Sequence, residues 1–381
     1  MARKVFFHIG APKTGTTYLQ LVMAQNREVL QKQGIVYADG RYAADRVHAS
    51  ELARGHDYSR DARAAGAWQR IVDQVEGANE DAVISHEFFG ACDEGQARSV
   101  ISDLAPAEVH LIFTARDYSR QATAVWQERL KYGRGVPLSK FTLDENNGTP
   151  VWSWRTQDAV AILARWSVGL APEHVHVVTV PPPKTAGNLL WTRFASVLGI
   201  DPESCDTNVA FANSSLGVVE AELLRRFDER RPEKFKDRRK AAAWVRNVLA
   251  NEVLASRDGE PLTLSTERFS ELAQASHGAA TAITAAGYDV VGDVNDLIPA
   301  PVRPGRAPEE VLDSELLDAA LDAIGGLLSS METKAQQRKK RATQKGPPSL
   351  VRRATPSSHR STGWIRGRHA ARRSTITSRT G

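Results

Sequence analysis

The chain reads His8-Ile9-Gly10-Ala11-Pro12-Lys13-Thr14-Gly15-Thr16-Thr17-Tyr18-Leu19 near its N-terminus, and this stretch decides the fold. It begins at the end of an apolar segment, residues 5–9, that is typical of a buried strand. It continues into residues 16–33, where apolar side chains recur at the spacing of one helix face. A strand, a glycine-containing loop and a helix N-terminus direct backbone N–H groups and the positive end of a helix dipole toward one point. We expect that point to bind an anion such as a phosphate group.

The position of the lysine separates this loop from the loop of metal-dependent NTPases. Gly10 and Gly15 have the glycine spacing of the Walker A motif, but Thr16 stands where that motif requires lysine, and the lysine lies at position 13. The Walker lysine and the Ser or Thr after it serve a triphosphate and its magnesium ion. A lysine inside the loop suits a single terminal anion instead, so metal-dependent NTP hydrolysis is disfavoured. A tight turn capped by threonines is the alternative.

Strands and helices alternate after this loop, which indicates an α/β domain with a central parallel sheet and helices on both faces. The predicted strands are residues 5–9, 35–37, 82–85, 109–114 and 174–180. The predicted helices among them are residues 16–33, 67–76, 94–104, 119–131, 157–170 and 188–198, with a polar stretch before residue 66. Later helices are predicted over residues 218–230, 241–256, 265–286 and 308–328, with an irregular, proline-containing connection at 288–305. We therefore expect one α/β domain over residues 1–330, with helical additions from about residue 211.

Positive charge is concentrated at the end of the chain. Residues 331–381 hold 14 Lys and Arg against the single acid Glu332, so the net charge of +5 divides into +13 for this segment and −8 for the rest. The segment has few apolar residues and is predicted to be a disordered basic tail. Such a tail attracts anionic membrane surfaces or nucleic acid without specificity. No stable protein partner is inferred.

Cysteine content and hydropathy indicate where in the cell the protein is expected to be. The two cysteines, Cys92 and Cys205, lie far apart and form no zinc-binding cluster or disulfide framework. The N-terminus enters the first predicted strand directly, which leaves no room for a signal sequence, and no apolar window is long enough for a membrane helix. We expect a soluble, cytoplasmic protein.

The string Pro12-Lys13-Thr14-Gly15-Thr16-Thr17 resembles the 5′-phosphosulfate loop of sulfotransferases that use 3′-phosphoadenosine 5′-phosphosulfate (PAPS), and is most similar to that of bacterial sulfotransferase-domain proteins. The resemblance implies the sulfotransferase fold, which is related to that of P-loop kinases. It implies that Lys13 contacts the bridging and sulfuryl oxygens of the donor. It also implies that the 5′-phosphate is held by Thr14, Gly15, Thr16 and Thr17. Sulfuryl transfer has a loose, in-line transition state like that of phosphoryl transfer, so a lysine and a helix N-terminus can stabilise the leaving oxygen without a metal.

A second segment, residues 111–126, resembles the 3′-phosphate site of the same family. In the family an arginine at a strand end and a serine in the next helix bind the 3′-phosphate of PAPS. Arg116 matches the arginine, whereas the serine position falls on Ala124. An arginine can make a bidentate, charge-assisted pair with a phosphate by itself. The missing contact would come from the first turns of the helix: Ser119, Arg120 or Thr123. The alternative is that Arg116 and Asp117 only cap that helix.

Two titratable residues, His86 and Glu87, follow the predicted strand 82–85. Parallel strands present functional groups at their carboxyl ends, the edge where the glycine loop also opens. Sulfuryl transfer requires the acceptor to lose a proton, so a general base is needed close to the loop. The family uses a histidine in its small-molecule enzymes and a glutamate in carbohydrate-directed members. Neighbours on an extended strand point to opposite faces, so one of the two is the base; Glu87 is favoured over His86.

Three other features near these motifs are assigned lesser roles. His8 is expected to be a satisfied core histidine. The charges within residues 126–131 are expected to form a solvated helix face. Trp152 and Trp154, with the residues 146–148 before them, form either a wall of the acceptor site or a contact that holds a loop.

The sequence thus predicts an enzyme, a PAPS-dependent sulfotransferase that uses no metal. Its acceptor would be a hydroxyl or amine of a carbohydrate, lipid or small molecule. Two alternatives remain open: a catalytically inactive protein that binds PAPS or its product, 3′,5′-phosphoadenosine (PAP), and, less favoured, a P-loop nucleotide kinase.

Overall fold

The structure is a computed structural model, and it describes residues 2–144, 152–183, 185, 188–209, 215–257, 259–301 and 305–344. The chain divides into two compact units, Met1–Met331 and Glu332–Gly381. The first unit contains the sheet and its helices.

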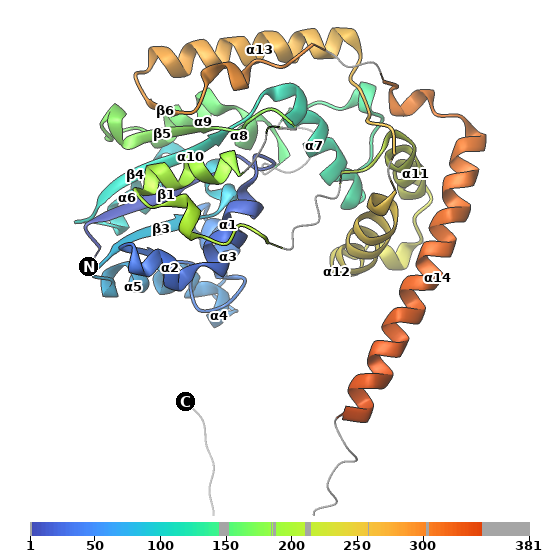
Figure 1. The fold of residues 1–381 in the computed structure, drawn as a ribbon, viewed down its shortest axis with the longest axis horizontal. Coiled ribbons are helices and arrows are strands. Elements are labelled where there is room, and N and C mark those ends of the chain that lie inside the picture. The colour runs from blue at the N-terminus through green and yellow to red at the C-terminus, as the bar shows by residue number, and fades with distance from the viewer. Residues whose placement is uncertain are drawn as a thin grey trace, which may run out of the picture. The chain divides into compact units, whose positions relative to one another are not determined.

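Within the described residues, six strands form one parallel sheet in the order β2-β3-β1-β4-β5-β6 (Figure 1). The strands are β1 (Lys4–His8), β2 (Ile35–Tyr37), β3 (Asp81–Ser85), β4 (Glu108–Ala115), β5 (Val175–Thr179) and β6 (Asp289–Val291). The α/β class, the parallel sheet and the five predicted strands are confirmed. The prediction of an irregular segment at 288–305 was wrong at β6, because three residues are too few for a recognisable pattern and pairing with β5 holds them as a strand.

Helices connect and cover these strands (Figure 1). Their bounds are α1 (Thr16–Gln25), α2 (Arg27–Lys32), α3 (Asp45–Ala53), α4 (Ala62–Ala65), α5 (Ala67–Gly77), α6 (Glu94–Asp103), α7 (Tyr118–Lys131), α8 (Trp154–Gln157), α9 (Ala159–Trp166), α10 (Leu189–Leu198), α11 (Val218–Glu229), α12 (Arg238–Lys240), α13 (Thr266–Ala285) and α14 (Asp313–Gln344). Helices α3 and α4 lie in the stretch before residue 66 that was predicted only as polar.

Two predicted helices are each divided. The helix predicted at 16–33 breaks at Asn26, whose side-chain amide donates to the carbonyls of Val22 and Asp206, both at 2.8 Å. The helix predicted at 157–170 divides at Asp158, which accepts a hydrogen bond from the backbone N–H of Ala161 and so caps α9. At Asp158 the carboxylate takes over a hydrogen bond that a continuous helix would make with its backbone, whereas the Asn26 amide adds a contact to Asp206 at the break.

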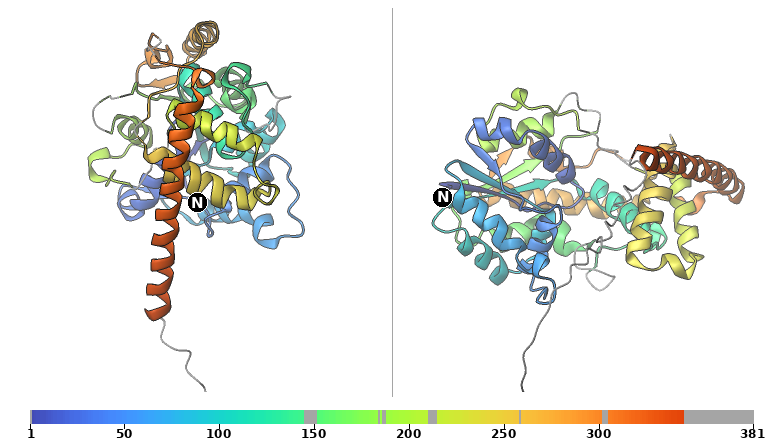
Figure 2. Two further views of the ribbon diagram at one scale, coloured as in Figure 1. Left: turned by 90° about the vertical axis from the view of Figure 1, so that its right-hand side faces the viewer. Right: turned by 90° about the horizontal axis from the view of Figure 1, so that it is seen from below.

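Each face of the sheet has its own apolar core. On one face, strand residues such as Phe7 and Leu111 pack against α5, α6, α9 and α13. On the other face, strand residues such as Phe6 and Ile112 pack against α1, α2 and α10. Figure 2, in its right-hand view, shows the sheet between these two layers of helices. Successive residues of a strand point to opposite faces, so burial of both faces requires almost continuously apolar strands.

A third apolar cluster joins the later helices to the sheet domain. It contains Val125 from α7, Leu224 from α11 and Val245 from η8 (Ala241–Val253), a segment with π-helical hydrogen bonding. Figure 1 shows α11 and α12 on the same side of the sheet as α7, beyond the carboxyl ends of the strands. The helical additions therefore cover the edge where the predicted site lies.

Helix α14 runs from Asp313 to Gln344, past residue 331, where the disordered tail was predicted to begin. That prediction was wrong for residues 332–344, where the few apolar residues do not prevent a continuous run of helix-forming Lys, Gln, Arg and Ala. Residues 345–381 lie outside the described residues. None of the helices in the described part of the chain is both long and apolar enough to cross a membrane.

Candidate functional site

Strands β1 and β4 are neighbours in the sheet, and the chain leaves them in opposite directions. From β1 it continues to β2 at one edge, and from β4 it continues to β5 on the other side (Figure 1). Ligands of open α/β sheets bind outside the carboxyl ends of the strands at such a switch point. The topology therefore brings the loop after β1 next to Arg116, which directly follows β4.

The loop between β1 and α1 depends on backbone conformations that favour glycine. Gly10 has φ 110° and Gly15 has φ 92°, and Lys13 also lies in the left-handed region with φ 68°. A Cβ atom on Gly10 would lie 3.0 Å from Cα of Glu87, so the loop and the predicted base are in close contact. Helix α1 starts after Gly15 with no side-chain cap. Its first N–H groups therefore face the loop without a side-chain acceptor, which suits an anion.

The predicted phosphate contacts require the loop threonines to face outward, but not all of them do. Thr14 is buried, and its hydroxyl lies 2.5 Å both from the carbonyl of Ala11 and from the hydroxyl of Thr114. Thr16 is also buried, whereas Thr17 is exposed. The Thr14 side chain therefore fixes the loop to β4, and contacts to a phosphate from this position would come from its backbone N–H.

Lys13 makes an ion pair that the sequence did not predict. Its Nζ donates to Oε2 of Glu128 at 2.8 Å, and Arg246 donates to the other oxygen at 3.1 Å. Burial alone would raise the pKa of Glu128, but the charges of Lys13 and Arg246 lower it to about 2. Burial lowers the pKa of nearby Lys131 to about 8. The expectation of a solvated face at 126–131 was wrong, because Glu128, Arg129 and Lys131 are buried against the later helices.

Arg116 lies directly on the loop. Its guanidinium donates to the carbonyl of Lys13 at 3.0 Å, and its Nε is buried with no hydrogen-bond partner among the described residues. Burial, with a smaller effect of the neighbouring Arg120 charge, lowers the pKa of Arg116 to about 10, so the group stays positive at neutral pH. The structure thus brings the two predicted anion-binding segments into contact and leaves one buried, charged donor unpaired.

The hydroxyl groups of Ser119 and Thr123 make hydrogen bonds within α7 and its N-terminal cap. Ser119 donates to Asp117 at 2.5 Å, and Thr123 donates to the backbone carbonyls of Ser119 and Arg120 at 3.1 and 3.0 Å. Asp117 caps α7 and forms an ion pair with Arg120. Both predicted hydroxyls therefore lie close to Arg116 in the chain but are engaged with their own helix.

Glu87 and His86 follow β3 and have different neighbours, and Glu87 begins the short helix η1 (Glu87–Ala91) instead of continuing the strand. Glu87 accepts a hydrogen bond at 3.2 Å from Gln20 of α1, whereas His86 packs against the rings of Phe88 and Phe89. Burial raises the pKa of Glu87, but His86 and Gln20 outweigh burial and lower it, so the carboxylate is ionised. Burial lowers the pKa of His86, and the Glu87 carboxylate opposes this shift. Of the two, Glu87 is the residue that lies against the glycine loop.

A chain of buried hydrogen bonds connects Glu87 with the loop, and the sequence analysis missed most of its members. His8 lies at its centre: Nδ1 is 2.8 Å from the Ser85 hydroxyl and Nε2 is 3.2 Å from the Thr114 hydroxyl. Burial lowers the pKa of His8 to about 4. His8 is thus a satisfied core histidine, as predicted. The chain runs in the order Glu87, Gln20, Ser85, His8, Thr114, Thr14. A shared signal was present in the sequence, since His8, Ser85 and Thr114 lie at or next to the carboxyl ends of three adjacent apolar strands.

The aromatic residues predicted near the acceptor are partly described. Trp152 contacts the ring of Phe88 edge-on, with centroids 5.7 Å apart, and Trp154 contacts Tyr118 at 5.1 Å. Residues 146–148 lie outside the described residues. Trp152 is therefore adjacent to the segment that carries Glu87, where an acceptor wall would stand.

Possible metal ligands gather elsewhere. In the described part of the chain, one group of His, Cys, Asp or Glu side chains is close enough to hold a metal ion: Glu108, His110 and His174. These residues lie where β4 and β5 begin, at the opposite edge of the sheet from the glycine loop.

Comparisons with known proteins do not assign the chain to a family, so its function is argued from the geometry of the site. A scan against protein-family models, a search of curated proteins and a search of solved structures each found no match to the chain.

Proposed function

We propose that the protein is a sulfotransferase that moves a sulfuryl group from PAPS to a hydroxyl or amine of a carbohydrate, lipid or small-molecule acceptor. We also propose that its α/β fold is the sulfotransferase fold, which is related to that of P-loop kinases. It rests on the loop motif quoted above and on the contacts that the structure gives to that loop.

One observation carries the proposal: the half-buried side chain of Arg116 donates to the backbone of the glycine loop, and its buried Nε has no partner among the described residues. A buried charged donor without a partner destabilises a fold by about 1–3 kcal/mol or more, so such a group is expected where a ligand supplies the partner. The uncapped N-terminus of α1 faces the same loop and also favours a negative ligand. A nucleotide with phosphate groups at its 3′ and 5′ positions matches this pairing of an arginine and a helix terminus.

The chemistry assigns different tasks to Lys13 and Glu87. The acceptor oxygen or nitrogen bonds to sulfur while the bond from sulfur to the 5′-phosphate oxygen breaks, and PAP leaves. Lys13 stabilises the negative charge that develops on that leaving oxygen. Glu87, ionised and next to Gly10, takes the acceptor proton.

Lys13 forms an ion pair with Glu128. Binding of the donor would exchange this carboxylate for the sulfuryl and phosphate oxygens. Glu128 would keep its hydrogen bond from Arg246, so the exchange leaves no buried carboxylate without a partner.

Calorimetric titration of the full chain with PAP, beside ATP with magnesium, tests the proposal. We expect PAP to bind with a micromolar or lower Kd and ATP to bind far more weakly. Lys13→Ala and Arg116→Ala should each weaken PAP binding at least tenfold, since each removes a charged contact. Exposed residues of the same types provide matched controls, and Lys32→Ala and Arg98→Ala should leave the Kd within twofold.

Each alternative predicts a different outcome. Absence of PAP binding would contradict the proposal, and tighter binding of ATP would favour a nucleotide kinase. Transfer of labelled sulfate from PAPS to a panel of sugars, phenols, amines and lipids separates an enzyme from an inactive binding protein. Glu87→Gln should bind PAP normally and lose transfer, whereas an inactive protein would transfer to none of these acceptors in its native form.

A further inference from the structure

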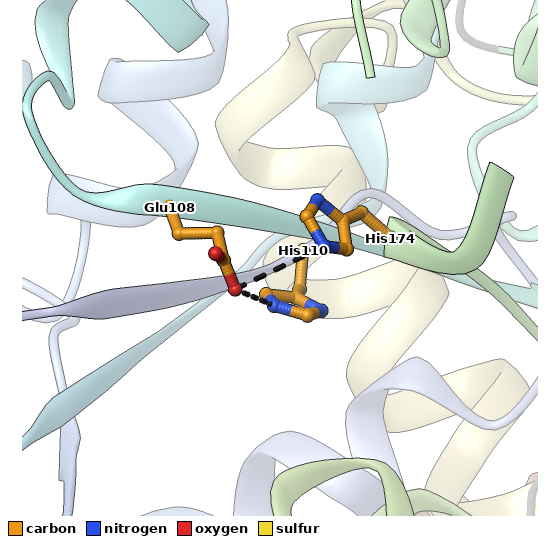
Figure 3. Close-up of side chains that lie close together, drawn as sticks. All are labelled: Glu108, His110 and His174. Carbon is orange, nitrogen blue, oxygen red and sulfur yellow. Dashed lines mark hydrogen bonds and ion pairs between the residues drawn. The ribbon is translucent and has the colours of Figure 1, made fainter. Parts of the chain in front are cut away.

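Histidine and carboxylate side chains gather at the amino edge of the sheet (Figure 3). Glu108 is the first residue of β4, His110 follows on the same strand, and His174 ends η5 (Pro172–His174) just before β5. One donor atom from each of the three lies within 4.8 Å of the others. The segments that supply them are far apart in the chain and have no part in the proposed sulfuryl transfer.

The strand register brings these residues together. Leu111 pairs with Val175, so the residues directly before them, His110 and His174, are neighbours across the sheet. Their rings lie 4.4 Å apart between centroids. Oε1 of Glu108 is 2.7 Å from Nε2 of His110 and 3.9 Å from Nε2 of His174 (Figure 3). One carboxylate oxygen and two imidazole nitrogens therefore face a common point.

A second layer of polar contacts lies behind His110. Its Nδ1 is 2.9 Å from Nε2 of His176, and Nδ1 of His176 is 2.7 Å from Oδ2 of Asp289 on β6. Histidines that bind metals usually donate their other ring N–H to an acceptor, often one that leads to a carboxylate. His176 and Asp289 occupy that position relative to His110.

The proton positions along this row conflict when no cation is bound. The contact with Glu108 requires a proton on Nε2 of His110, and the contact with Asp289 requires a proton on Nδ1 of His176. Two neutral imidazoles would then bring the bare Nδ1 of His110 and the bare Nε2 of His176 to 2.9 Å from each other. The row needs one additional positive charge, which is either a proton or a metal ion.

A metal ion at the common point removes the conflict. Nε2 of His110 then uses its lone pair for the metal, its proton sits on Nδ1 and is donated to His176, and His176 donates to Asp289. Every close contact in the row becomes a proper hydrogen bond or a coordination bond with both imidazoles neutral. We propose that Glu108, His110 and His174 bind one divalent transition-metal ion of the zinc class.

The donor set selects this class of metal. Two imidazoles and one carboxylate suit zinc and its neighbours, whereas magnesium and calcium prefer oxygen ligands throughout. Three protein ligands leave one position of a tetrahedral ion for water. Lys4 is the competing cation, with its Nζ 3.4 Å from Oε1 of Glu108. Its side chain is 45% exposed, so the ammonium can turn into solvent when the metal binds.

Titration of the full chain, without a polyhistidine tag, with zinc sulfate near neutral pH tests the site. We expect one zinc ion per chain with a micromolar or lower Kd, and no comparable binding of magnesium chloride. His174→Ala should weaken zinc binding at least 30-fold, and Asp289→Asn should weaken it about 10- to 100-fold through the second layer. Lys4→Ala should strengthen it severalfold. The matched control is His277→Ala, an exposed histidine on α13, which should leave the Kd within twofold.

Two results would overturn the proposal. One is native protein that binds zinc no more tightly than His174→Ala does. The other comes from the native chain alone and does not depend on folded variants: cobalt added in place of zinc should show the intense visible bands of a four- or five-coordinate ion. A spectrum that stays that of the hydrated ion would mean that the row is closed by a proton.

Discussion

The two edges of one sheet carry opposite chemistry. At the carboxyl edge, Lys13 and Arg116 gather positive charge beside the start of α1, and at the amino edge Glu108 lies among histidines. The difference follows from the βα pattern, because helices begin at the carboxyl edge with the positive end of their dipoles and end at the amino edge with the negative end. The helix dipoles therefore favour anions at the first edge and cations at the second. β4, whose eight residues span about 25 Å, joins the two.

The largest expected effect at the carboxyl edge comes from adding a methyl group to the glycine loop. Gly10→Ala places a Cβ atom 3.0 Å from Cα of Glu87 at φ 110°, so both strain and backbone overlap arise. We expect the free energy of unfolding to fall by about 2–4 kcal/mol and PAP binding to be lost. Gly34→Ala is the matched control, since it has φ 84° but no atom within 4 Å of the added Cβ. It should cost about 1 kcal/mol and leave PAP binding intact, as measured by urea unfolding and calorimetry. Equal losses in the two variants would mean that close packing against Glu87 does not shape the loop.

His8 links stability at the carboxyl edge to pH. Its pKa is about 4 in the folded protein against 6.5 ordinarily, so the unfolded chain binds more protons between these values. Stability is therefore fully present above pH 6.5 and falls as the pH drops through this window. The loss between pH 7.5 and pH 5 should be about 2 kcal/mol from this residue.

Urea unfolding of His8→Asn at the two pH values measures that contribution. The variant should be less stable at both, but its loss between them should be smaller by about 2 kcal/mol than in the native chain. His277→Ala, which removes an exposed histidine, should keep the native pH dependence. An unchanged difference in His8→Asn would show that His8 does not stay neutral in the fold.

Removal of the carboxylate that holds Lys13 should have a smaller effect, in the opposite direction. Glu128→Gln frees Lys13 and removes a negative charge near the expected anion, so PAP should bind about five- to tenfold more tightly, or about 1 kcal/mol. Glu94→Gln removes an exposed ion pair of α6 and should change nothing. Weaker PAP binding in Glu128→Gln would mean that Glu128 positions Lys13 for the ligand and does not compete with it.

Some parts of the fold and of the candidate site at the carboxyl edge could be predicted from the sequence. The residues of the predicted loop site form one contiguous string between a strand and a helix. Five strands could be predicted because their apolar runs are long enough to recognise. Arg116 was predicted because the strand end that carries it resembles the 3′-phosphate site of the sulfotransferase family. These features depend on neighbours in the chain, and local patterns record them.

Features that depend on distant segments were missed. Glu128 appeared as part of a solvated helix face because helix η8, which buries it and supplies Arg246, comes more than a hundred residues later. Strand β6 is short and half-exposed, and only its pairing with β5 makes it a strand. The histidine row needs the register of β4, β5 and β6, which no spacing within one segment encodes.

The smallest expected effect tests whether the two edges act independently. Zinc at the amino edge and PAP at the carboxyl edge would lie about 25 Å apart along a strand buried on both faces. A coupling free energy requires two states that each ligand prefers differently, and a packed parallel sheet offers one. We therefore expect the Kd of PAP to change less than twofold when zinc sulfate saturates the chain, and zinc binding to change equally little with PAP. A larger, reciprocal change would show that β4 shifts as a unit and that the metal controls the loop.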